Sequence, residues 1–335
     1  MEQTPKKLSN SFDWLMIVAI SWFIGGLYLD GWAHNNIPSL ETFFTPWHAV
    51  MYSGFFVTAA CLVGKTVLNR RTKSSWKEAV PFGYTYALFG VGLFLVSGAA
   101  DLIWHQIFGI EKSTEALLSP THIFLAIGGF LIYTGPFVAG AMRAKFKQMN
   151  LSLPMLLSLI YGFSVITFMT QFATFAHLLN IGIKPSTVSL QSIYDGLSVS
   201  SFLFQVIFVS GIFLTVMRRF RFPFGSFTLL FLLNTIGMTI MKTSTWLIPA
   251  ALIAGFCIDG LVCILKPAST AIRFRAFATL FPAVFFICYL TSVTMTGTLW
   301  WSIHMWTGSV VVPSIMGLLM SLVIWPPELL KLDTE

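Results

Sequence analysis

The chain has 335 residues, of which 56% are hydrophobic and only 10% are charged, and its mean hydropathy is +0.79. This composition excludes an ordinary soluble domain, in which about a quarter of the residues are charged, and predicts an all-α polytopic integral membrane protein. The net charge of +7 does not call for a nucleic-acid partner, because the positions of the basic residues account for it through membrane topology.

A helix needs about 20 apolar residues to cross the hydrocarbon core of a bilayer, and the sequence predicts about ten such helices. The predicted spans are 13–34, 46–68, 80–105, 120–142, 151–179, 196–217, 224–242, 246–265, 273–299 and 307–325. The first four spans form two helical hairpins, 13–70 and 80–145, that repeat one sequence pattern. We therefore divide the chain into a duplicated part, 1–145, and six further helices of the same bundle, 146–335.

The basic residues orient these spans. With the N-terminus inside, all lysines and arginines except Lys112, Lys184 and Lys242 fall on the inner side. Such an imbalance is typical of cytoplasmic loops, so we expect a multi-pass plasma-membrane protein with both termini in the cytoplasm. The four cysteines lie within apolar runs and have no Cys-x-x-Cys spacing, which argues against disulfides and thiolate metal sites.

The duplicated pattern consists of costly polar residues. The stretch "DGWAHNNIPSLETFFTPWH" (30–48) and the stretch "DLIWHQIFGIEKSTEALLSPTH" (101–122) share Asp-x3-His, a short loop, and then Glu-x4-Pro-x-His. All six histidines of the chain are expected at the outer ends of spans or in outer loops. Ionisable groups near the hydrocarbon core are expensive, so their clustering predicts a functional site.

Helical spacing explains how the pattern forms a site. Residues four apart share a helix face, and Thr45 and Ser119 are natural N-caps before a proline in the first turn. Each hairpin can therefore bring one carboxylate and two imidazoles together, a donor set that suits copper, zinc or iron. The predicted metal ligands are Asp30, His34, His48, Asp101, His105 and His122. The residues expected to support them are Glu41, Glu115, His177 and His304.

The first copy resembles a known metal-binding region. Residues 28–55, with Asp30, His34, Glu41 and the run "FTPWH" ending at His48, are similar to the C subunit of the copper membrane monooxygenases, the particulate methane and ammonia monooxygenase family. A looser second copy covers residues 100–130. The resemblance implies copper at Asp30, His34 and His48 in a membrane protein, and it supports these more than any given oxidation. The lipid bilayer, an apolar small-molecule substrate, and a homo-oligomer or partner membrane subunits are the expected partners.

Three functions remain open at this point. The favoured one is a copper-dependent oxygenase or oxidoreductase that takes a small or lipidic apolar substrate at the non-cytoplasmic face. The alternatives are a copper acquisition or transport protein and a zinc-dependent membrane hydrolase. The sequence identifies no catalytic residue, and it allows either one dinuclear centre or two mononuclear sites. Asp259, toward the inner end of its span, is either an ion relay or a partner of a neighbouring helix.

Overall fold

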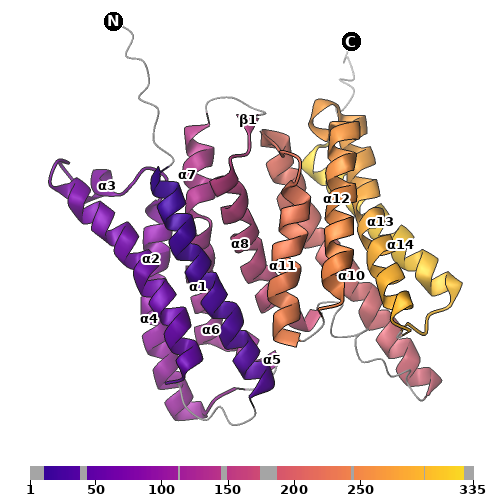
Figure 1. The fold of residues 1–335 in the computed structure, drawn as a ribbon, viewed down its shortest axis with the longest axis horizontal. Helices are drawn as coiled ribbons and strands as arrows, with labels where there is room; N and C mark the ends of the chain where they lie inside the picture. Colours follow the sequence, from indigo (N-terminus) through magenta and orange to yellow (C-terminus); the bar gives the residue numbers. More distant parts are fainter. Residues whose placement is uncertain are drawn as a thin grey trace, which may run out of the picture. The chain divides into compact units, whose positions relative to one another are not determined.

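The computed structural model describes residues 11–37, 44–111, 114–144, 149–173, 187–242, 245–297 and 299–327. Its contacts divide the chain into two compact units, which are described separately (Figure 1). The first unit takes its described residues from 1–145, 152–170 and 237–243, and the second contains the remainder. The first unit therefore combines the duplicated part, 1–145, with the helix that follows it and with residues 237–243.

The protein is an all-α polytopic membrane protein. In the described part, 8 helices are long and apolar enough to span a bilayer, and Leu153–Met169 and Ser226–Met241 are shorter apolar helices. These helices occur in the order of the ten predicted spans. The fifth span, predicted to extend to residue 179, has its helix end at Met169, and residues 174–186 lie outside the described part.

The helices and strands have the following bounds. The first unit contains α1 (Ser11–Asn36), α2 (Pro46–Arg70), α3 (Trp76–Ala79), α4 (Thr85–Phe108), α5 (Thr114–Leu118), α6 (Pro120–Tyr133), α7 (Gly135–Arg143) and α8 (Leu153–Met169). The second unit contains β1 (Met149–Asn150), η1 (Gln171–Ala173), α10 (Val188–Arg219), β2 (Phe220–Arg221), α12 (Leu247–Leu265), η2 (Pro267–Ser269), α13 (Ala271–Met295) and α14 (Ile303–Ile324). α11 (Ser226–Lys242) begins in the second unit and ends in the first.

The two hairpins, α1 with α2 and α4 with α6, pack in the same way. A Cβ atom on Gly54 would lie 2.6 Å from Cα of Phe23, and one on Gly128 would lie 2.9 Å from the backbone nitrogen of Phe94. Each phenylalanine precedes the motif aspartate by seven residues, and each glycine follows the second motif histidine by six. The duplication therefore includes the close backbone approach that holds each hairpin together, as expected for small residues between membrane helices.

Aromatic rings form the core between the two hairpins. The ring of Phe23 lies 5.8 Å from Phe55, 5.0 Å from Phe94 and 5.0 Å from Tyr133, and Phe55 stacks on Phe94 at 4.5 Å. All four side chains are at most 4% exposed. This rigid core lies about two helical turns from the motif residues of α1 and α4, so it fixes the spacing of the hairpins near the candidate site.

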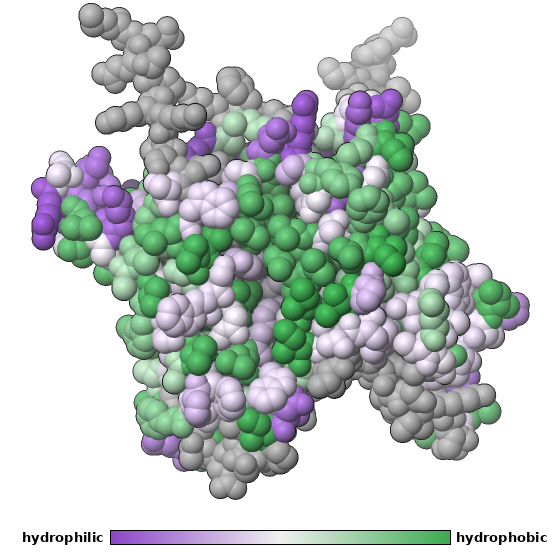
Figure 2. All heavy atoms as spheres, viewed as in Figure 1, coloured by the Kyte–Doolittle hydropathy of each residue, from purple (hydrophilic) through white to green (hydrophobic). Residues whose placement is uncertain are grey.

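The opposite faces of these helices are apolar and exposed. Val18, Phe56, Phe89 and Val96 are 67%, 56%, 65% and 68% exposed. Figure 2 shows hydrophobic residues over much of the viewed face and a hydrophilic group beside α3. Such a surface is expected where helices contact lipid, because unpaired apolar area of this extent is rare on soluble proteins.

The fourth predicted span is one apolar segment, Pro120–Arg143, that is broken into α6 and α7 at Thr134. Pro136 has no backbone N–H and interrupts the helical hydrogen bonds there. The hydroxyl of Ser158 in α8 satisfies two backbone groups at this break. It donates a hydrogen bond to the carbonyl of Tyr133 at 2.6 Å and accepts one from the amide of Phe137 at 2.9 Å.

In the second unit, Asp259 has a structural environment. Its carboxylate accepts the amides of Phe227 and Thr228, both at 3.0 Å, and the Thr228 hydroxyl at 2.7 Å. A carboxylate at a helix N-terminus satisfies amides that have no partner within the helix. Of the two readings of Asp259, pairing with a neighbouring helix is the one that the structure supports.

Candidate metal centre

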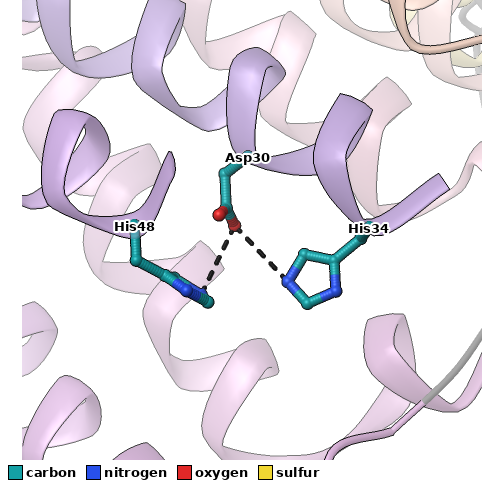
Figure 3. A group of neighbouring side chains, drawn as sticks. All are labelled: Asp30, His34 and His48. Carbon is teal, nitrogen blue, oxygen red and sulfur yellow. Dashed lines mark ion pairs between the residues drawn. The ribbon is translucent and has the colours of Figure 1, made fainter. Parts of the chain in front are cut away.

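The first group of motif residues forms a compact triad. Asp30 and His34 extend from the last turns of α1, and His48 extends from the first turn of α2 (Figure 3). Both imidazoles face one carboxylate oxygen: Nε2 of His34 lies 3.7 Å from Oδ2 of Asp30, and Nε2 of His48 lies 3.5 Å from it. One ligand atom from each residue lies within 4.8 Å of the others.

The second group repeats this arrangement. Asp101 and His105 extend from the end of α4, and His122 from the first turn of α6. Nε2 of His105 lies 3.2 Å from Oδ2 of Asp101, and Nε2 of His122 lies 3.6 Å from Oδ1. The three ligand atoms again lie within 4.8 Å of one another. The structure therefore brings together all six predicted ligands, three in each hairpin.

These distances distinguish between hydrogen bonding and metal coordination. Nitrogen and oxygen atoms that share a hydrogen bond lie about 2.7–3.2 Å apart, whereas three of the four separations are 3.5, 3.6 and 3.7 Å. Two ligands that each lie about 2.1 Å from a tetrahedral ion are separated by about 3.4 Å. Direct Asp–His hydrogen bonding therefore accounts for the pair of His105 and Asp101, at 3.2 Å, and not for the other three pairs. The donor types of both triads suit a transition-metal ion.

The N-caps of α2 and α6 orient one histidine in each triad. Oγ1 of Thr45 accepts the amide of His48 at 3.1 Å and lies 3.0 Å from Nδ1 of the same residue. Oγ of Ser119 accepts the amide of His122 at 3.4 Å and lies 2.6 Å from its Nδ1. Each ring is held through Nδ1, so its Nε2 faces the carboxylate, as is usual for imidazole ligands of metals.

Glu111 supports His105, and the sequence pattern did not identify it. Its Oε2 lies 3.0 Å from Nδ1 of His105, which also lies 3.3 Å from the carbonyl oxygen of Gly109. The Gly109 carbonyl can only accept, so this hydrogen bond places a hydrogen atom on Nδ1, and the Glu111 carboxylate is an ion-pair partner of the same ring. Nε2 is then the ring nitrogen that faces Asp101. Gly109 ends α4 with a φ of 82°, and this turn brings Glu111 back to the histidine.

The triads are separate groups within the first unit, but their charges interact. The six ligand atoms form two clusters and not one. The carboxylates of Asp30 and Asp101 are close enough to act on each other electrostatically, and His48 feels the charge of Asp101. The motif residues therefore form two neighbouring groups of possible metal ligands, one from each copy of the motif.

The phenol of Tyr52 lies between the hairpins. Tyr52 is one turn after His48 in α2, with ring centroids 6.4 Å apart, and a Cβ on Gly98 of α4 would lie 3.0 Å from its oxygen. The charges of both motif aspartates act on it. The corresponding residue of the second copy is Ala126, so this phenol is a feature that the two copies do not share.

The remaining predicted residues are placed differently. Glu41 and His177 lie outside the described residues. The side chain of Glu115 is exposed, and its backbone carbonyl accepts the amide of Ser119 at 3.0 Å. His304 is exposed in the first turn of α14, in the second unit. Glu111, rather than Glu115, is the acidic residue that contacts the second triad.

Comparison with known proteins finds no relative of the chain. No family model, no curated protein and no solved structure matches the chain. The resemblance of residues 28–55 to the copper monooxygenase C subunit therefore stays a prediction from the motif, and the chain is established as a polytopic helical membrane protein with two candidate metal-binding triads.

Proposed function

We propose that the protein is a membrane-embedded metal protein, and that it holds copper in the two triads. The observation that carries this proposal is the spacing of the donor atoms, since 3.5, 3.6 and 3.7 Å are too long for hydrogen bonds and suit ligands of one ion. Imidazole and carboxylate donors suit copper, zinc and iron. The motif of the first copy favours copper among these.

We further propose that the activity is an oxidation of a small or lipidic apolar substrate. Copper supplies one-electron and dioxygen chemistry that protein side chains lack. The chain's own residues then have three tasks: the histidines and aspartates hold the ion, the N-cap hydroxyls orient the rings, and the apolar helices exclude water. An apolar substrate can reach such a site laterally from the bilayer.

The membrane orientation is part of the proposal. In the first unit, the triads lie at one end of the hairpins and exposed Arg71, Lys73 and Lys77 lie at the other. Basic residues favour the cytoplasmic side, so the triads are assigned to the opposite face. Labelling of Lys73→Cys and Glu115→Cys with a membrane-impermeant thiol reagent should modify residue 115 from outside and residue 73 only after permeabilisation.

Metal analysis tests the proposal directly. Protein purified in mild detergent should contain copper with nitrogen and oxygen ligands by X-ray absorption, and the variant H34A/H48A should lose one of two equivalents. His304→Ala is the matched control, because this exposed histidine belongs to the second unit, and it should retain both. Full metal content in H34A/H48A would indicate that the first motif has only a structural role. Zinc in place of copper would favour a hydrolase.

A functional assay separates oxidation from copper transport. Reconstituted protein supplied with a reductant should consume dioxygen in the presence of apolar substrates, and H34A/H48A should not. Transport would need a polar route across the bilayer, and the described Asp259 is already occupied by Phe227 and Thr228. Copper uptake into vesicles without dioxygen consumption would overturn the oxidase proposal and support transport.

A further inference from the structure

The two triads have the same donors but different surroundings. In the second triad, Oδ1 of Asp101 accepts a hydrogen bond from Oγ1 of Thr121 at 2.6 Å. The corresponding residue of the first copy is Trp47, whose ring packs against Trp32 with centroids 5.5 Å apart. An indole in this position supplies no hydroxyl, so Asp30 lacks the bond that fixes Asp101.

The carboxylates of the two triads also differ in how far they are exposed. The side chain of Asp101 is 2% exposed and that of Asp30 is 12% exposed. His105 is 6% exposed, whereas His34, its counterpart in the repeat, is 28% exposed. The third ligands show the opposite difference in exposure, since His122 is 22% exposed and His48 is 11% exposed. The difference between the triads therefore concerns the Asp-x3-His part, in which the His34 side chain is more exposed than that of His105.

Anchoring of the histidines adds to this difference. Nδ1 of His105 is held by Glu111 at 3.0 Å and by the Gly109 carbonyl at 3.3 Å. Among the described residues, His34 forms an ion pair with Asp30, and its ring contacts the ring of His48. Supporting groups of this kind change metal affinity by about 10–100-fold when they are removed.

We propose that the two sites are not equivalent: the Asp101–His105–His122 triad holds its metal firmly, and the Asp30–His34–His48 triad is the one that exchanges metal and accepts small ligands. This inference rests on the proposed metal binding and assigns separate roles to the two sites. The second triad is already arranged for an ion, because its carboxylate and His105 are fixed before binding. In the first triad, Trp47 stands in place of Thr121 and His34 is more exposed, and a less preorganised set of ligands binds more weakly and releases its ion faster.

Electrostatic repulsion adds to the expected difference in metal affinity between the two triads. The carboxylates of the two triads act on each other, and His48 feels the charge of Asp101. A cation in the second triad therefore lowers the attraction of the first triad for another cation. Loading should proceed in two steps, with the second triad filled first.

Chelator release measures this difference. Protein loaded with two equivalents of copper and then mixed with excess EDTA should release them in two phases, at rates that differ by at least 10-fold. H34A/H48A should keep only the slow phase, and H105A/H122A only the fast phase. Thr121→Val keeps every ligand and should accelerate the slow phase by about 10–100-fold without changing the fast phase.

A matched control separates this effect from general loss of a buried hydroxyl. Thr58 is 0% exposed and donates to the Gly54 carbonyl of its own helix at 2.8 Å, so Thr58→Val should leave both phases unchanged. Release of both equivalents in one phase, or loss of the fast phase in H105A/H122A, would overturn the inference while leaving metal binding intact. Protein that binds no copper at all would overturn the proposed function, and this inference with it.

Discussion

The close helix contact in each hairpin should control metal binding two turns away. In Gly54→Ala, the new Cβ would lie 2.6 Å from Cα of Phe23, and ordinary contact begins at 3.4 Å, so α1 and α2 must separate by 0.8 Å. The opposing atom belongs to the backbone and cannot rotate away. Forcing packed elements apart costs about 1–3 kcal/mol, which exceeds the gain of about 1 kcal/mol from replacing a helical glycine with alanine.

The same movement would disturb the first triad. A separation of 0.8 Å between the helices, added to the 3.5 Å between Nε2 of His48 and Oδ2 of Asp30, gives a spacing that two ligands of one tetrahedral ion, about 3.4 Å apart, do not adopt. We therefore expect Gly54→Ala to lose the copper of the first triad and retain that of the second. Gly128→Ala, which closes on Phe94, should show the reverse.

Two glycines of the same hairpins supply the control. A Cβ on Gly64 of α2 or Gly92 of α4 meets nothing within 4 Å, so alanine there should leave metal content unchanged and raise stability slightly. The assay combines thermal unfolding in detergent with copper analysis of each purified variant. If Gly54→Ala matches Gly64→Ala in both stability and copper content, the reasoning from close packing to site geometry is wrong.

Three further predictions concern other contacts. Ser119→Ala should lower the free energy of unfolding by about 0.5–2 kcal/mol because an N-cap is lost, and it should also weaken copper binding in the second triad. Ser302→Ala removes the N-cap of α14 and should lower stability alone. Equal copper affinity in the two variants would contradict this prediction. Asp259→Ala should destabilise the protein by about 1–3 kcal/mol because the amides of Phe227 and Thr228 lose their acceptor, and copper content and dioxygen consumption should be unchanged. Loss of activity in a stable variant would instead support an ion relay at Asp259. Ser158→Ala should lower the thermal midpoint because the Phe137 amide loses the hydroxyl that accepts it, and hydrogen exchange at that amide should be faster than in the unmodified protein. Unchanged protection at that amide would refute this prediction.

Much of the site could be predicted from the sequence because its geometry is local. An aspartate and a histidine four residues apart share a helix face, and Thr45 and Ser119 stand directly before prolines, so both caps and both second histidines follow from spacing. The hairpins bring these parts together through short connections. Each triad therefore depends on one turn of helix and one loop, which sequence patterns describe well.

Glu111 could not be predicted in the same way. Alignment of the two copies pairs Glu41 with Glu115 and does not indicate Glu111, which contacts His105. The contact with His105 depends on the positive φ of 82° at Gly109, a conformation open to glycine and costly for other residues. The longer loop of the second copy contains this turn, and the repeat pattern carries no signal for it.

The break between α6 and α7 has a similar cause. Pro136 indicates that the helix is interrupted, but the residue that satisfies the freed groups, Ser158, comes from another helix. Asp259 also needed the structure, because a carboxylate in an apolar span is equally consistent with a relay and with a cap. Long-range partners decide both cases, and a single sequence does not name them.

The offset between the copies shows where they differ in length. Phe23 and Phe94 are 71 positions apart, and Gly54 and Gly128 are 74 apart, so the length difference lies entirely in the loop and both helix registers are retained. Each hairpin therefore carries its own triad and its own glycine contact, and a change in the length of one loop need not shift the helices that carry the other triad.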